Sequence, residues 1–164
     1  MKKIITMVLV GLMVFSSSMA VFAEELAVQN EKVKKMGAAG LKEFTEEVHQ
    51  INALRVEAHQ LKIQLIEKQD KLFDLFAEAK EAENKEVFKA AKEERKQIKA
   101  VNDEMKALHE QAVTARKAFK EALKNNDKET AGAELEKFIN SHETINDRQE
   151  DKVEILDKVI DILS

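Results

Sequence analysis

The chain has 164 residues, of which none is Cys, Pro, Trp or Tyr and only 4 are Gly. The absence of Cys excludes a disulfide framework and a cysteine-based zinc site. The scarcity of turn-forming residues argues against a β-sandwich and against a Gly-rich phosphate-binding loop. The composition therefore favours an all-α fold of long helices.

Charge is abundant and nearly balanced. The 27 Lys and Arg residues are interspersed with 31 Asp and Glu residues, which gives a net charge of -4. A protein that binds duplex nucleic acid needs a basic stripe that displaces counterions, and the sequence contains none. We therefore expect no nucleic-acid partner.

The first 23 residues have the pattern of a secretory signal peptide. Lys2 and Lys3 precede an apolar run over residues 4–15, and small or branched residues lead to a cleavage point after Ala23. The run is shorter than the roughly 20 residues that span a bilayer comfortably, although an uncleaved N-terminal anchor is the alternative. We expect an exported, bacterial type of protein that has no stable membrane anchor after cleavage. Its destination would be the periplasm, the cell-wall space or the medium.

A polar leader is predicted over residues 24–40, and a helical domain over residues 41–164. Apolar residues spaced alternately by three and four predict a helix over 41–82 that packs through a coiled-coil-like seam. This first seam consists of Ile51, Leu54, Ala58, Leu61, Leu65, Lys68, Leu72, Leu75 and Ala79. Leu41, Phe44 and Val48 extend the stripe backwards.

A second seam predicts a helix over 86–124, but its phase slips by one residue relative to the first. Either a turn lies within residues 80–86, with Asn84 as a helix cap, or one helix continues from 41 to 124. The second seam consists of Val87, Ala91, Glu94, Ile98, Val101, Met105, Leu108, Ala112, Ala115, Phe119 and Ala122.

The next break is clearer, because Asn125 and Asn126 tolerate a left-handed backbone and Asp127 can cap a helix. A third helix is predicted over 127–163, with a seam that is polar in its middle and strongly apolar at its end. Its members are Ala131, Leu135, Phe138, His142, Ile145, Gln149, Lys152 or Val153, Leu156, Val159 and Leu163.

These three helices predict an antiparallel up-down-up bundle in which the seams merge into one core. The first two helices would then pair along their length, with Ala58 beside Leu108. The alternative is a long helical hairpin, with one helix over 41–124, that dimerises. Lys68 and Glu94 interrupt opposing seams, and we interpret them as residues that fix register at some cost in stability.

Candidate chemistry is sparse. His59, His109 and His142 are predicted at one level of the bundle, where they could bind a metal or respond to pH. The pairs His109-Glu110 and His142-Glu143 lack the second His, four positions on, of a zinc-protease helix. We expect neither an enzyme nor a cofactor.

Several large apolar side chains lie off the seams, and one three-helix core cannot bury them all. They predict a surface for a protein partner, which would be a client polypeptide, an envelope component or a second copy of the chain. These candidates are Ile63, Ile66, Phe73, Phe88, Val113 and Ile155.

An exported chain of long amphipathic helices, without Cys or Pro, resembles in outline the Spy-type periplasmic chaperones. That resemblance implies a helical cradle that holds unfolded proteins during envelope stress. The family's Leu-Thr-x-x-Gln motif is absent, and the nearest segments, 61–64 and 54–57, do not match it. The predicted function is thus a chaperone-like polypeptide binder; the alternatives are a scaffolding coiled coil and a histidine-based metal or pH sensor.

Overall fold

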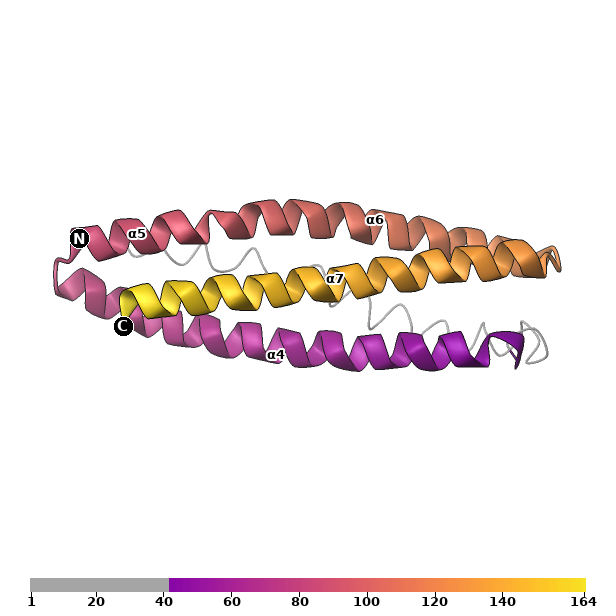
Figure 1. Ribbon diagram of the computed structural model, residues 1–164, viewed down its shortest axis with the longest axis horizontal. Coiled ribbons are helices and arrows are strands. Elements are labelled where there is room, and N and C mark those ends of the chain that lie inside the picture. Colours follow the sequence, from indigo (N-terminus) through magenta and orange to yellow (C-terminus); the bar gives the residue numbers. More distant parts are fainter. Residues whose placement is uncertain (1–41) are drawn as a thin grey trace, which may run out of the picture. The chain divides into compact units, whose positions relative to one another are not determined.

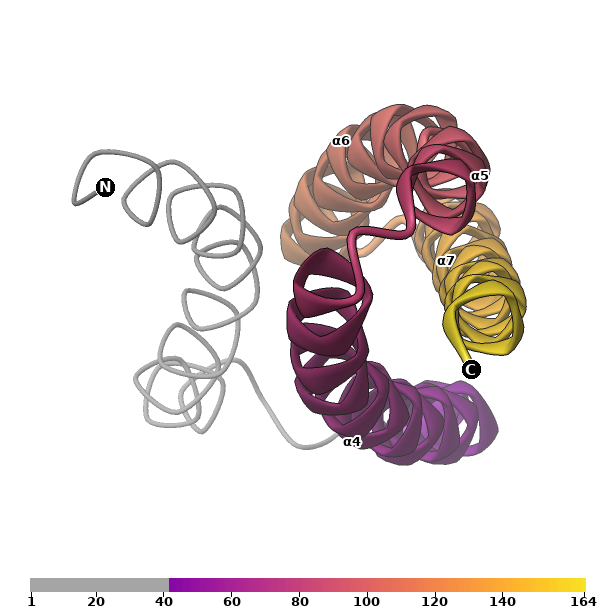
Figure 2. The same ribbon diagram turned by 90° about the vertical axis from the view of Figure 1, so that its left-hand side faces the viewer.

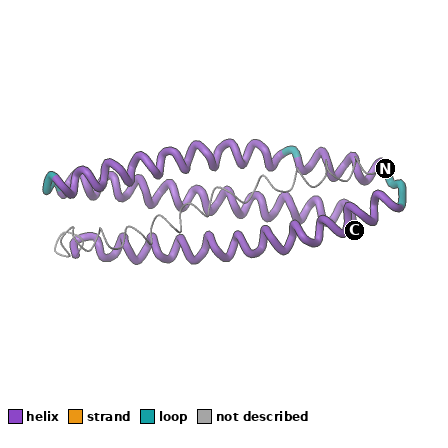
Figure 3. The backbone as a smooth tube through the Cα atoms, turned by 180° about the vertical axis from the view of Figure 1, so that it is seen from behind, coloured by secondary structure: helices purple, strands orange, loops and turns teal. Residues whose placement is uncertain are grey.

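The structure, a computed structural model, describes residues 42–164. The predicted signal peptide 1–23 and leader 24–40 lie outside the described residues. A short 3-10 helix, η2 (Lys42–Phe44), precedes four α-helices, and the described part contains no strand (Figure 3). The α-helices are α4 (Thr45–Glu81), α5 (Lys85–Arg95), α6 (Gln97–Lys124) and α7 (Lys128–Leu163).

The helices of residues 44–164 form an up-down-up bundle, as predicted, with α5 and α6 together making the descending arm (Figure 1). Helix α7 packs along both α4 and α6, whereas α4 and α6 hardly approach one another. Seen end-on, the helices wind around each other (Figure 2). The pairing predicted along most of the first hairpin does not form, because α7 lies between the other two arms.

A tight turn joins α4 to α5 at the predicted phase slip. Glu83 adopts a left-handed conformation, with φ of 52°. Its backbone N–H donates to the Lys80 carbonyl at 3.2 Å, and the Asn84 N–H donates to the Ala79 carbonyl at 3.2 Å. This is a Schellman motif, which stops a helix without Gly or Pro. The continuous helix over 41–124, on which the alternative hairpin depends, is therefore wrong.

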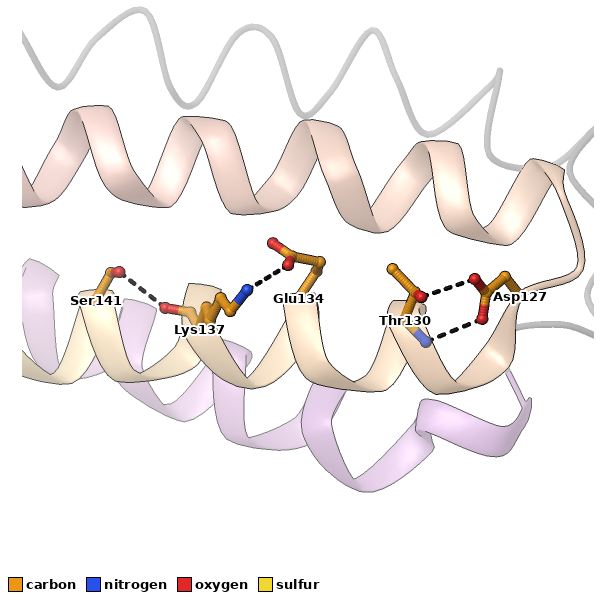
Figure 4. A network of polar contacts seen from close by, with 5 residues as sticks. All are labelled: Asp127, Thr130, Glu134, Lys137 and Ser141. Atoms are coloured by element: carbon orange, nitrogen blue, oxygen red, sulfur yellow. Dashed lines mark hydrogen bonds and ion pairs between the residues drawn. The ribbon is translucent and has the colours of Figure 1, made fainter.

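The second turn repeats this design. Asn126 is left-handed, with φ of 54°. The Asp127 carboxylate accepts from the Thr130 N–H at 3.1 Å and from the Thr130 hydroxyl at 2.7 Å (Figure 4). These two hydrogen bonds lower the pKa of Asp127. The residue is thus the N-cap of α7, as its position after two Asn residues predicts.

The descending arm is interrupted once, at Lys96, where the sequence predicted a single helix over 86–124. The Lys96 N–H donates to the Glu93 carbonyl at 3.1 Å, and the Lys99 N–H to the Lys96 carbonyl at 3.1 Å. Both bonds span three residues, so the helix tightens locally without changing direction sharply. Figure 3 marks this point between α5 and α6.

The core consists of two apolar clusters at opposite ends of the bundle. The cluster at the α4–α5 turn joins all three arms, and its fully buried members include Val159, with 0% exposure. The other cluster lies near the α6–α7 turn, where Phe44 and Phe119 pack edge to face with centroids 5.7 Å apart. From Ile51 to Ala79 and from Val87 to Ala122, every seam residue is buried or half-buried. The seam assignments for these two helices are therefore confirmed.

Lys68 forms its ion pair with Asp157 of α7. Its partner therefore lies on α7 and not on the descending arm that carries Glu94. Because α7 is the shared neighbour of the other arms, a polar group in the α4 seam meets α7 first. The pair links α4 to α7 at one height and so favours one register.

Replacing Lys68 with Leu is expected to raise the melting temperature by a few degrees. The Lys68 side chain is 24% exposed and Asp157 50%, so their ion pair contributes less than about 1 kcal/mol. A Leu there would extend the apolar stripe between Leu65 and Leu72. The control is Asp157→Asn, which removes the pair without adding apolar surface and should not raise the thermal midpoint. A lower midpoint in Lys68→Leu would contradict this reasoning.

Candidate functional site

A stripe of exposed apolar side chains runs along the outer face of α4. We call Val56, Ile63, Ile66 and Phe73 the α4 outer stripe. Their exposed fractions are 58%, 56%, 56% and 52%. Such values are unusual for large aliphatic and aromatic residues when four of them share one helix face.

The stripe faces away from the rest of the bundle. The residues of α4 that are buried are Leu61, Leu65, Leu72 and Ala79. At 100° per residue, the stripe lies well over a quarter-turn around the helix axis from this buried row. Helix α4 therefore has two apolar faces, of which the bundle covers one.

The six predicted partner-binding residues differ in how exposed they are. Ile63, Ile66 and Phe73 lie in the α4 outer stripe, as expected. Phe88, on α5, is 40% exposed and meets Phe76 edge to face at 5.4 Å. Val113 is only half-buried on α6, and Ile155 is 6% exposed within the core.

Ile155 is thus wrongly predicted as a surface residue. Helix α7 contacts both other arms, so it buries a wider stripe than a single seam, and Ile155 packs in the same cluster as Leu156. Conversely, the prediction missed Val56, which lies seven residues before Ile63 and continues the stripe by one heptad. Val48, which was expected to extend the first seam backwards, is 39% exposed.

The middle of α7 is a second unusual region, because it is polar and buried. The buried polar residues of the described part all belong to α7: Ser141, Asn146, Gln149 and Lys152. We call this segment, together with His142, the α7 polar segment. It separates the two apolar clusters of the core.

Asn146 anchors this segment to α4. It is 3% exposed, and its side-chain amide donates to the Leu54 carbonyl at 3.0 Å and to Glu57 Oε2 at 2.8 Å. Nearby, Ser141 donates to the Lys137 carbonyl at 2.8 Å (Figure 4). Buried polar residues with satisfied hydrogen bonds fix the register of packed helices.

His142 on α7 interacts electrostatically with His109 on α6. Burial, together with the charges of His109, Arg55 and Arg116, lowers the pKa of His142 to about 4. Burial also lowers the pKa of His109. Two arginines and a second imidazole therefore make a proton on His142 unfavourable.

The predicted group of three histidines is not assembled. His109 and His142 come close enough for their charges to interact, but His59 is exposed on α4. Within residues 42–164, no group of three His, Asp or Glu side chains is positioned to bind a metal ion. The sequence predicted the height of His59 along the bundle but not the direction in which its side chain points. One step along a helix rotates that direction by 100°.

In the described part of the chain, no helix is long and apolar enough to cross a bilayer. Comparison of the chain with models of protein families, with curated proteins and with solved structures found no match. The two unusual regions of the bundle are the α4 outer stripe and the α7 polar segment.

Proposed function

We propose that this chain is an exported, non-enzymatic protein that binds other polypeptides through the α4 outer stripe. The observation that supports this proposal is the exposure of four large apolar side chains, each above one half, along one face of a helix. An apolar helix face of this kind binds an amphipathic helix or an extended apolar segment. The chaperone-like resemblance and the sequence pattern at residues 1–23 are consistent with such a role outside the cytoplasm.

The test measures whether the protein suppresses aggregation of a chemically denatured client, followed by light scattering. The full chain is expected to suppress scattering. The double variant Ile63→Glu with Ile66→Glu should lose most of that activity, because two carboxylates in the stripe oppose burial of apolar surface. Both positions are exposed, so the fold should not change.

The matched control is Gln64→Glu with Lys71→Gln. Both residues are exposed on α4 but lie outside the stripe, and the pair changes the net charge by the same amount as the stripe variant. It should suppress aggregation as well as the unsubstituted chain. Equal activity in both variants, or none in the unsubstituted chain, would refute client binding by this face.

A second candidate function is pH sensing by the α7 polar segment. The observation that favours it is the low pKa of His142, about 4, within a group that includes His109, Arg55 and Arg116. Protonation of His142 would place a further positive charge in that group. Its test is the pH dependence of the stability of the unsubstituted chain compared with that of His142→Gln.

A further inference from the structure

We propose that a second copy of this chain binds to the α4 outer stripe, so that two α4 helices pack antiparallel about a two-fold axis between Ile63 and Ile66. This inference rests on the proposed function, because it names one polypeptide that the stripe binds. It is carried by the order of residues along the stripe.

The stripe has the spacing of a coiled-coil seam and contains two polar positions. Alternate steps of three and four give Val56, His59, Ile63, Ile66, Asp70 and Phe73, and all six are exposed. In an antiparallel pair, the residue numbers of the two helices run in opposite directions, so the two numbers in every facing pair have the same sum. When Ile63 faces Ile66 of the second copy, Val56 faces Phe73 and His59 faces Asp70.

In this register, the two residues of every layer are chemically compatible. Apolar residues meet apolar residues in the central layer and in both outer layers. His59 meets Asp70 of the second copy twice, once on each side of the axis, and an imidazole beside a carboxylate is a favourable pair. A shift of one heptad in one direction places Ile63 against His59, and a shift in the other direction places Asp70 against Ile66. Either shift therefore puts an isoleucine against a polar residue.

The residues beside the stripe fit the same arrangement. In an antiparallel pair, each flank meets the same flank of the other copy. Lys62 then lies beside Gln69 of the second copy, and Gln60 beside Glu67, so no like charges face each other. A parallel pair would bring Lys62 near Glu67 of the second copy. It would also place Asp70 against Asp70 in the seam between the two helices, where like charges cost most.

The first experiment measures the mass of the full chain by sedimentation equilibrium from micromolar to millimolar concentration. A dimer of twice 18.6 kDa is expected at the higher concentrations. His59→Glu should weaken dimerisation by at least about tenfold, because it places two carboxylates together in two symmetric layers. The double variant His59→Glu with Asp70→Lys restores opposite charges and should return the dissociation constant to near its original value.

This rescue separates the antiparallel pair from its alternatives. In a parallel pair, the double variant would bring the two introduced carboxylates together in one layer and the two introduced ammonium groups together in another, and no rescue would follow. His59 and Asp70 are both exposed in the bundle, so circular dichroism should show an unchanged fold in every variant. A monomer at all concentrations, a single variant without effect, or a double variant no better than the single would overturn the inference.

A distance measurement gives an independent check, because the chain has no native Cys. A nitroxide on Ala53→Cys, an exposed site at the edge of the predicted contact, should be about 35 Å along the axis from its copy in the antiparallel pair. Labels only about one helix diameter apart, roughly 10–12 Å, would indicate a parallel pair and refute the inference.

The outcomes also distinguish this inference from the proposed function. A chain that stays monomeric yet loses aggregation suppression in the Ile63→Glu, Ile66→Glu variant binds clients but not itself, so only the dimer fails. A chain that dimerises with the expected rescue but never suppresses aggregation is a self-associating scaffold. In that case the dimer stands and client binding fails.

Discussion

The bundle is expected to lose about 2 kcal/mol of stability through His142 when the pH falls from 7.5 to 5. The pKa of His142 is lowered from 6.5 to about 4 in the folded protein. Near neutral pH, His142 is uncharged in both the folded and unfolded states, so it has no effect. Below pH 6.5 the unfolded state binds a proton that the folded state rejects, and the equilibrium shifts toward unfolding. The loss is complete only below about pH 4.

The physical reason lies in what surrounds the ring. The charges of His109 and Arg116 on α6 and of Arg55 on α4 all disfavour a positive charge on the ring. Burial acts in the same direction and is the largest cause. Because burial also lowers the pKa of His109 below its usual 6.5, that residue adds to the loss as the pH falls.

The measurement is urea unfolding of the chain and of His142→Gln at pH 7.5 and pH 5. Carboxylates such as Asp127 also titrate at low pH, so the informative quantity is the difference between the two proteins. The stability of His142→Gln should fall less than that of the unsubstituted chain between the two pH values. His59→Gln, at an exposed site, serves as the control and should lose as much stability as the unsubstituted chain. Equal losses in all three proteins would eliminate the role of His142.

Local spacing predicted three helical segments within residues 42–164 and the turn after Lys124, and it marked residues 80–86 as the place where the chain either turns or continues as one helix. The seam of α4 from Ile51 onward and that of α5 and α6 contain only buried or half-buried members, because a three-four alternation keeps side chains on one face of any helix. The two turns were also encoded locally. A left-handed Glu83 or Asn126 ends one helix, and the next residue, Asn84 or Asp127, caps the following one.

Counting one seam for each helix did not identify the helix that the other two share. A count of seams assumes that each helix buries one stripe, and on that basis Ile155 was placed at the surface. Because α7 packs against both α4 and α6, it buries Ile155 and Ile160 as well as Val159. The same property of α7 explains why Lys68 pairs with Asp157, a partner that no pattern within α4 specifies.

The sequence predicted the candidate site only in part. Spacing within one helix is visible in the sequence, whereas the packing between helices is not. Ile63, Ile66 and Phe73 are spaced as a second stripe on α4, and that spacing is visible in the sequence. The proximity of His109 and His142 depends on the pairing of α6 with α7. Their positions on either side of the Asn125-Asn126 turn suggested that pairing. The exclusion of His59 depends on helix phase across the bundle, which no single helix determines.

Replacing Leu156 with Ala should have the largest effect of any single substitution considered, a loss of about 2–5 kcal/mol. Leu156 is 3% exposed and belongs to the apolar cluster that contains residues of α4, α5, α6 and α7. Truncating it leaves a cavity where the arms meet. Since small domains are stable by only about 5–15 kcal/mol, this single change removes a large fraction of the total.

Ile66→Ala provides the contrast that makes this experiment informative. Ile66 is 56% exposed, so at low protein concentration, where association between copies is least, its truncation should change stability by less than about 0.5 kcal/mol. Thermal or urea unfolding of both variants at low concentration measures the difference directly. A small loss for Leu156→Ala would contradict α7 as the centre of the bundle. A large loss for Ile66→Ala that grows with protein concentration would instead show that the α4 outer stripe is buried by association, because only a contact between copies depends on concentration.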